Sequence, residues 1–243
     1  MAETLTIQTA DGEFTAYVAR PKVTPASVVV VLHEVFGVNA DIRTTCQELA
    51  DRGFIAVAPD LFWQQERGVA LDMWSEAEWQ KGLSLYAAYD RGTGVRDILA
   101  TIDAARRMPG TSGKVALMGF CLGALLVFLT SARGEVDAAV AYHGADTEKY
   151  LNEADGITGP FMMHLAEEDE FITKGAQARI KTALAGKANF QVFSYAGCSH
   201  AFARHTGHHY NAAAALLANG RTWAFLSDRL SVAPAVLPVA AGA

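Results

Sequence analysis

Short apolar runs alternate along the chain with stretches in which apolar residues recur at helical spacing. Residues 27–32 read SVVVVL, and residues 54–58 form a second apolar run. Continuous runs of this length are typical of strands that are buried on both faces of a sheet. Residues 94–108, in contrast, carry apolar side chains at intervals of three and four, which predicts a helix. Strands that alternate with helices predict an α/β protein with a mostly parallel sheet of about eight strands and helices on both faces.

The remaining elements complete this pattern. Asp11–Gly12 lies between two short strand patterns and predicts a hairpin turn, and Asn39 is placed to cap a helix that Gly53 ends. Further strands are expected at 5–9, 14–19, 114–118, 136–142, 161–165 and 190–195, and further helices at 122–131, 176–184 and 210–226. Residues 62–92 are less regular and predict a lid-like excursion over one end of the sheet. We expect one domain over residues 1–230 and a mobile tail over 231–243.

Composition narrows the class of protein. The 243 residues include 20 basic and 26 acidic side chains, a formal net charge of −6, with 51% hydrophobic residues. This composition excludes intrinsic disorder, and the net acidity argues against nucleic acid as a partner. The apolar runs are too short to span a membrane, no signal peptide is visible, and the odd number of cysteines, three, does not suggest a disulfide framework. We therefore expect a soluble, cytoplasmic protein that is a monomer or weak dimer.

The sharpest chemical signal is the segment Gly119-Phe120-Cys121-Leu122-Gly123, between a predicted strand and a predicted helix. It has the form of a nucleophile elbow with cysteine in place of serine. The turn is so tight that side chains two positions either side of the nucleophile would clash, which explains the two glycines. The amide of Leu122, at the helix N-terminus, is then free to donate to a developing oxyanion. The alternative is a structural cysteine in a glycine-rich turn.

Two downstream residues fit the same chemistry. Asp169 follows the strand predicted at 161–165, and His200 follows the strand predicted at 190–195. The order nucleophile, acid, histidine is that of hydrolases with this elbow, and the carboxyl ends of parallel strands meet at one edge of a sheet. His200 is then expected to take the thiol proton, with Asp169 orienting its imidazole. Each residue alone has an ordinary explanation as part of a polar loop.

His205, His208 and His209 suggest a metal site only weakly. Carboxylates or cysteines at ligand spacing are missing, and neighbouring histidines on a helix point apart. We expect neither a metal nor any other cofactor.

Taken together, these motifs resemble the dienelactone hydrolases, the carboxymethylenebutenolidases of the α/β-hydrolase superfamily. The resemblance covers roughly residues 5–230 and rests on four segments: 33–39 (HEVFGVN), 58–61 (APDL), 119–123 (GFCLG) and 197–204, in which Gly197, His200, Phe202 and Arg204 stand. It implies an α/β-hydrolase fold and a cysteine hydrolase that opens an unsaturated lactone carrying a carboxylate, with maleylacetate as product.

The resemblance also implies roles for individual residues. Cys121 would be the nucleophile, His200 its base and Asp169 the orienting acid. Glu34 would meet the resting thiol and change partner when substrate binds, whereas its ordinary alternative is to cap the helix that begins near Asn39. The amide of Val35 would be the second oxyanion donor.

Substrate-binding roles follow in the same way. Arg204 would bind the substrate carboxylate, and three aromatic residues would line the pocket: Phe36, Tyr142 and Phe171. Lactone-specific members carry a second arginine in the lid-like segment, whereas this chain has Trp79 at the equivalent position, with Lys81 nearby as a possible charge. His33 also stands where some members have glutamine. The exact lactone is therefore left open.

Two other functions remain compatible with these residues. The same scaffold can hydrolyse other small esters, lactones or thioesters, because fold alone does not determine the reaction. Alternatively, the chain is a non-catalytic ligand-binding protein that uses Cys121 as a redox sensor. A complete triad speaks against the second alternative, because a sensor needs no Asp169–His200 pair.

Overall fold

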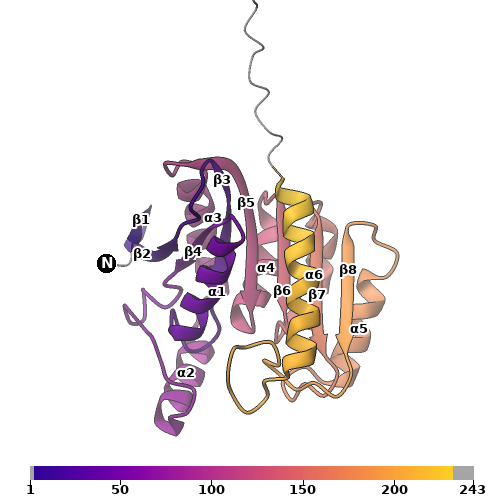
Figure 1. The fold of residues 1–243 in the computed structure, drawn as a ribbon. Coiled ribbons are helices and arrows are strands. Elements are labelled where there is room, and N and C mark those ends of the chain that lie inside the picture. Colours follow the sequence, from indigo (N-terminus) through magenta and orange to yellow (C-terminus); the bar gives the residue numbers. More distant parts are fainter. Residues whose placement is uncertain (1–2, 232–243) are drawn as a thin grey trace, which may run out of the picture.

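A computed structural model describes residues 3–231, and its eight strands form one sheet (Figure 1). The strand order is β1-β2-β4-β3-β5-β6-β7-β8. β1 pairs antiparallel with β2 and β2 antiparallel with β4, whereas all other neighbours are parallel. The strands are β1 (Glu3–Thr9), β2 (Gly12–Ala19), β3 (Ala26–Leu32), β4 (Ile55–Pro59), β5 (Thr111–Phe120), β6 (Ala138–Tyr142), β7 (Phe161–Ala166) and β8 (Phe190–Tyr195). The predicted sheet is confirmed, including the hairpin at Asp11–Gly12.

Helices cover both faces of this sheet. They are α1 (Ala40–Asp51), α2 (Glu76–Ala88), α3 (Arg91–Arg106), α4 (Leu122–Arg133), α5 (Lys174–Leu184) and α6 (Ala212–Leu230), with short 3-10 helices η1 (Thr147–Lys149) and η2 (Leu151–Gly156). Figure 1 looks onto the face that α1 and α6 cover, and α3, α4 and α5 pack behind the sheet. The central helix α4 is buried from Leu122 to Ser131.

The central strand β3 shows why the sequence forms this layered arrangement. Val28, Val30 and Leu32 join the core on the α3–α4 side, whereas Val29 and Val31 join the core under α1 and α6. Successive residues of a strand point to opposite faces, and helices cover both faces of this sheet. All five side chains are therefore fully buried. The uninterrupted apolar run therefore reflects two cores that share one strand.

The segment 62–92 is more ordered than expected. Its second part is helix α2, which Ser75 caps by accepting from the Glu78 amide at 3.4 Å. Only Gly82 of α2 is buried, so the helix has no broad apolar face, and its sequence shows little helical periodicity. A Cβ atom there would lie 2.8 Å from the Val35 carbonyl oxygen, so α2 packs closely on the loop after β3.

Two expectations concern the chain as a whole. Residues 232–243 of the expected mobile tail lie outside the described residues, as do residues 1 and 2. Within residues 3–231, no helix combines the length and the apolar character that crossing a bilayer requires.

Candidate active site

Cys121 lies in a strained turn between β5 and α4. Its φ of 51° is in the left-handed region, which is unusual for a residue with a side chain. A Cβ atom on Gly119 would lie 2.4 Å from the Gly123 carbonyl oxygen, and one on Gly123 would lie 2.1 Å from the Leu32 carbonyl oxygen. Both positions therefore require glycine, and the turn presents the sulfur of Cys121 at the carboxyl edge of the sheet.

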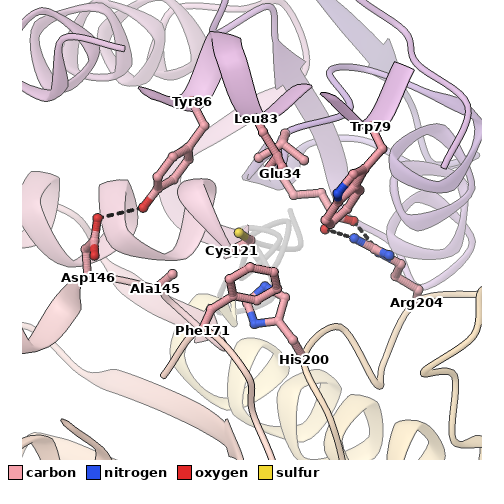
Figure 2. A pocket seen from close by; sticks show the side chains of 11 residues that line it. Glu34, Trp79, Leu83, Tyr86, Cys121, Ala145, Asp146, Phe171, His200 and Arg204 are labelled. Carbon is pink, nitrogen blue, oxygen red and sulfur yellow. Dashed lines mark hydrogen bonds and ion pairs between the residues drawn. The ribbon is translucent and has the colours of Figure 1, made fainter. Parts of the chain in front are cut away.

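His200 lies beside Cys121 and is held from behind by Asp169. Its Nδ1 lies 2.9 Å and 3.0 Å from the two carboxylate oxygens of Asp169. Asp169 is held in turn by the amides of Phe171 and Ile172, which donate to Oδ1 at 2.9 Å and 3.0 Å. The buried Nε2 of His200 has no hydrogen-bond partner within residues 3–231 and faces the side of the pocket where Cys121 lies (Figure 2).

The charges around His200 favour its protonated form. Burial by itself lowers the pKa of the imidazole, but the nearby Cys121 sulfur and the hydrogen bond to Asp169 outweigh burial and raise that pKa well above its usual value. An imidazolium beside Cys121 stabilises the thiolate, which is the nucleophilic form of cysteine.

Two further rings hold the imidazole of His200 edge to face. The centroid of Phe171 lies 4.8 Å away and that of His143 lies 4.5 Å away. His143 is fully buried, and burial lowers its pKa well below the usual value, so this second imidazole is neutral. His200 therefore rotates little.

Glu34 and Arg204 form a buried ion pair at one side of the site. The Nε of Arg204 donates to Oε1 of Glu34 at 2.6 Å, and its Nη2 donates to Oε2. The Glu34 side chain is 3% exposed and that of Arg204 12%, and a charge so buried needs a partner of this kind. Glu34 does not cap α1, because Asn39 accepts from the Ile42 amide. The contact of Glu34 with the thiol that the resemblance implies is replaced here by Arg204.

These residues surround one pocket of about 140 Å³ above Cys121. Figure 2 shows Cys121 between two polar pairs, Tyr86 with Asp146 on one side and Glu34 with Arg204 on the other. Phe171, which was expected as a wall, and Trp79, which was expected in place of a lid arginine, both line the pocket. The complete lining is Glu34, Val35, Trp79, Leu83, Tyr86, Cys121, Ala145, Asp146, Phe171, His200 and Arg204.

Three expected pocket residues lie elsewhere. Tyr142 is fully buried on the other face of the sheet, where its hydroxyl is 2.6 Å from Oγ1 of Thr222. Phe36 is fully buried under the Arg204 guanidinium, 5.0 Å from its ring centroid, and so supports the pocket without lining it. Lys81 points away and pairs with Glu66 at 2.6 Å. The expectations for Tyr142 and Lys81 were wrong because neighbouring residues of a strand or helix face different ways. The expectation for Phe36 was wrong because it lies in the loop after β3, where its ring packs beneath Arg204.

Four lining residues were not foreseen: Leu83, Tyr86, Ala145 and Asp146. Trp79, Leu83 and Tyr86 are spaced by four and three residues, so α2 presents them on one face. That spacing was the available signal. Ala145 and Asp146 follow β6 and carried no recognisable motif.

The backbone supplies hydrogen-bond donors next to Cys121. Leu122 is the first residue of α4, and the first amides of a helix have no acceptor within it. Val35 lines the pocket from the loop after β3. Among residues 3–231, neither amide donates to another backbone group outside the regular helices and strands. Both are therefore available to a bound oxygen.

The other histidines of this loop are engaged in protein contacts. His205 lies 2.7 Å from Oδ1 of Asp41, His208 packs edge-on against Trp74, and Nδ1 of His209 lies 3.0 Å from the His200 carbonyl oxygen. No group of three or more His, Cys, Asp or Glu side chains in residues 3–231 is arranged to hold a metal ion. Cys46, Cys121 and Cys198 are free and buried.

Comparison with known proteins gives the family of the chain. The model of the dienelactone hydrolase family matches residues 14–230. The chain belongs to the dienelactone hydrolase family. The carboxymethylenebutenolidase of Pseudomonas putida is 39% identical over 235 residues, covering 96% of this chain and 100% of that protein. Carboxymethylenebutenolidase 1 of Cupriavidus pinatubonensis is 34% identical over 216 residues, covering 89% and 92%.

A solved structure agrees on the fold of this dienelactone hydrolase family member. A dienelactone hydrolase-like promiscuous phosphotriesterase from metagenomic libraries superposes with a TM-score of 0.79 at 22% identity, covering 95% of this chain and 99% of that one. The α/β-hydrolase fold is thereby confirmed. With the family and the curated relatives, the protein is a hydrolase of esters or lactones, and a purely non-catalytic redox sensor is the wrong interpretation.

Proposed function

We propose that the protein opens dienelactone-type lactones with Cys121 as nucleophile, His200 as acid and base, and Asp169 as the residue that orients His200. One observation carries this proposal. The Cys121 sulfur and the unpartnered Nε2 of His200 belong to the same pocket, while Asp169 holds Nδ1 of that imidazole. This is the arrangement that activates a cysteine for acyl transfer.

The first half-reaction follows from the charges. The Cys121 thiolate attacks the lactone carbonyl carbon and forms a carbon–sulfur bond, which moves an electron pair onto the carbonyl oxygen. The amides of Leu122 and Val35 donate to that oxyanion. Collapse of the intermediate breaks the ring carbon–oxygen bond, and the enolate leaving group takes the proton of the His200 imidazolium. The product of this step is a thioester on Cys121.

Water completes the cycle. Neutral His200 accepts a proton from a water molecule, and the resulting hydroxide attacks the thioester carbonyl. Breakage of the carbon–sulfur bond releases a carboxylate and restores the thiolate beside the imidazolium. Asp169 keeps Nε2 of the His200 imidazole directed at the sulfur in both half-reactions. The amides of Phe171 and Ile172 hold the Asp169 carboxylate in the position that this requires.

Arg204 and the aromatic walls are proposed to position the lactone. Two nitrogens of Arg204 are bound to Glu34, so the guanidinium offers its Nη1 side to a substrate oxygen unless Glu34 changes partner. Trp79 and Phe171 contact the planar lactone ring of the substrate from either side of the pocket. We also propose that the protein acts in the cytoplasm, where its three free cysteines stay reduced, as a monomer or weak dimer.

The deciding experiment is hydrolysis of cis- and trans-dienelactone by wild type and single variants. Cys121→Ala is expected to lower kcat/KM by at least about a thousandfold, and Asp169→Asn by about a hundredfold or more. Cys198→Ala is the matched control, because it removes a buried thiol outside the pocket. A thioester adduct on Cys121 detected by mass spectrometry after rapid quenching supports the mechanism. Full activity of Cys121→Ala on dienelactones refutes it.

A further inference from the structure

Tyr86 and Asp146 form the end of the pocket that lies across Cys121 from Arg204 (Figure 2). The Tyr86 hydroxyl donates to Oδ2 of Asp146 at 2.7 Å. Tyr86 comes from α2 and Asp146 from the turn after β6, so this hydrogen bond joins the lid-like segment to the sheet edge. Both side chains are partly buried and both line the space above the sulfur.

The protonation states make this end of the pocket an acceptor. Partial burial opposes the charged form of Asp146, but hydrogen bonds from Lys149 and Tyr86 outweigh it and hold the Asp146 pKa below its usual value. Burial and the neighbouring Asp146 carboxylate raise the Tyr86 pKa, so the phenol keeps its proton. Because that proton is donated to Asp146, the phenol oxygen and the carboxylate present only lone pairs to a ligand.

Two cations hold Asp146 from outside the pocket. Arg91 lies 3.2 Å from Oδ2, and Lys149 lies 2.6 Å from Oδ1. Neither cation lines the pocket. A carboxylate has about four acceptor positions, and Tyr86, Arg91 and Lys149 use three of them. The carboxylate is thus fixed and charged, and it lines the pocket while the two cations that hold it do not.

We propose that Tyr86 and Asp146 select lactones that carry a hydrogen-bond donor, a hydroxyl or amino group, on the side remote from Arg204. This inference rests on the proposed lactone hydrolysis and specifies its substrate class. A substrate carboxylate at this end meets acceptors only and loses its water without replacement, which is costly. A hydroxyl or ammonium group replaces its water by a hydrogen bond to a charged or polarised oxygen.

Four butenolides that differ at one position test this selection. Each is a dienelactone, whose carboxymethylidene group on the carbon next to the ring oxygen is directed to Arg204 in the proposed reaction. Each carries methyl, hydroxymethyl, aminomethyl or carboxymethyl on the opposite ring carbon, next to the carbonyl, and ring opening is followed by the loss of ultraviolet absorbance. For wild type, we expect kcat/KM for the hydroxymethyl and aminomethyl compounds to exceed that for the methyl compound about tenfold, as one hydrogen bond to a charged group allows. The carboxymethyl compound is expected to be the poorest.

Two variants connect the preference to these side chains. In Asp146→Asn, the amide also donates, so the ratio of aminomethyl to methyl is expected to fall toward one and the relative rate of the carboxymethyl compound to rise. In Tyr86→Phe, the hydroxymethyl preference is expected to shrink while the carboxylate of Asp146 remains. Asp155→Asn is the matched control, because it removes one exposed carboxylate that pairs with Lys187 outside the pocket. Its ratios are expected to equal those of wild type.

The outcomes separate this inference from the function on which it rests. Equal kcat/KM for the four compounds, or ratios that survive both Asp146→Asn and Tyr86→Phe, overturns the selection while Cys121-dependent turnover still supports the hydrolase. If no butenolide is opened, titration calorimetry of the same compounds into Cys121→Ala decides. A dissociation constant about tenfold lower for hydroxymethyl than for methyl supports the selection, and equal constants overturn it.

Discussion

Two buried histidines make the folded protein sensitive to mild acid. His33 and His164 are fully buried, and burial lowers their pKa to about 4 and about 3. His33 is fixed in its neutral form, because its Nδ1 lies 2.6 Å from the Glu34 carbonyl oxygen while its Nε2 accepts from the Leu61 amide at 3.1 Å. A proton on Nε2 would remove that acceptor. We therefore predict that His33→Gln and His164→Gln each weaken the dependence of stability on pH.

The magnitude follows from proton linkage. A histidine in the unfolded chain has a pKa of about 6.5. Each buried histidine therefore makes its full contribution to the free energy of unfolding above that pH, and this contribution is lost as the pH falls toward the lowered pKa of the folded state. From pH 6.5 to pH 5, the unfolded chain takes up protons that folded His33 and His164 do not bind. One pH unit corresponds to about 1.4 kcal/mol, so each residue lowers the free energy of unfolding by about 2 kcal/mol over this range.

Other histidines do not cancel this loss. The pKa of His200 and that of His205 are raised, so their stabilising contributions are complete below pH 6.5 and change little from there to pH 5. His143 adds to the loss, because burial lowers its pKa well below the usual value.

Urea unfolding followed by circular dichroism at pH 7, 6 and 5 measures the effect. Between pH 7 and pH 5, each glutamine variant is expected to lose about 2 kcal/mol less stability than wild type, whatever its stability at pH 7. His208→Gln controls for the loss of one histidine, because it lies exposed against Trp74. If wild type and both buried-site variants lose the same free energy, the reasoning from burial is refuted.

Three further predictions concern the turn at Cys121, the loop after β8 and the lid-like segment. Gly123→Ala places a Cβ 2.1 Å from the Leu32 carbonyl oxygen, so we expect a loss of about 3 kcal/mol in the free energy of unfolding and loss of hydrolysis, which thermal unfolding and a rate assay check. Hydrogen bonding to Asp41 raises the pKa of His205 to about 9. We therefore expect the free energy of unfolding of His205→Gln to be about 1 to 2 kcal/mol lower than that of wild type at pH 6. This difference is expected to disappear as the pH rises through 9. A difference independent of pH contradicts this. Trp79→Arg adds a planar cation beside the Glu34–Arg204 pair, and kcat/KM is expected to rise about tenfold for carboxylated lactones relative to neutral ones, whereas equal changes for both classes contradict the assignment.

Much of the fold and of the candidate site follows from short stretches of sequence. The SVVVVL run predicts a strand buried on both sides, because only such a strand tolerates apolar residues at every position. The segment around Cys121 predicts its own turn, since Gly119 is required by its close approach to Gly123 within that turn. Gly123 is required by the Leu32 carbonyl oxygen at the end of the neighbouring strand β3. The sequence also predicts that Asp169 and His200 lie near each other, because each stands in the loop after a strand and parallel strands bring their carboxyl ends together. In the structure, Nδ1 of His200 lies 3.0 Å from Oδ1 of Asp169.

Only the tertiary structure decided which side chains surround the sulfur and what charge they present. Tyr86 and Asp146 are sixty residues apart in sequence, and their hydrogen bond depends on how α2 lies over the end of β6. Tyr142 was wrongly expected in the pocket because its ring turns to the opposite face of the sheet, a matter of strand register. The sequence by itself therefore determined the fold class and pointed to Cys121, Asp169 and His200 as candidate residues, because the signals for both are local. The polarity of the pocket is set by contacts between distant segments, and such contacts leave no periodic pattern in a single chain.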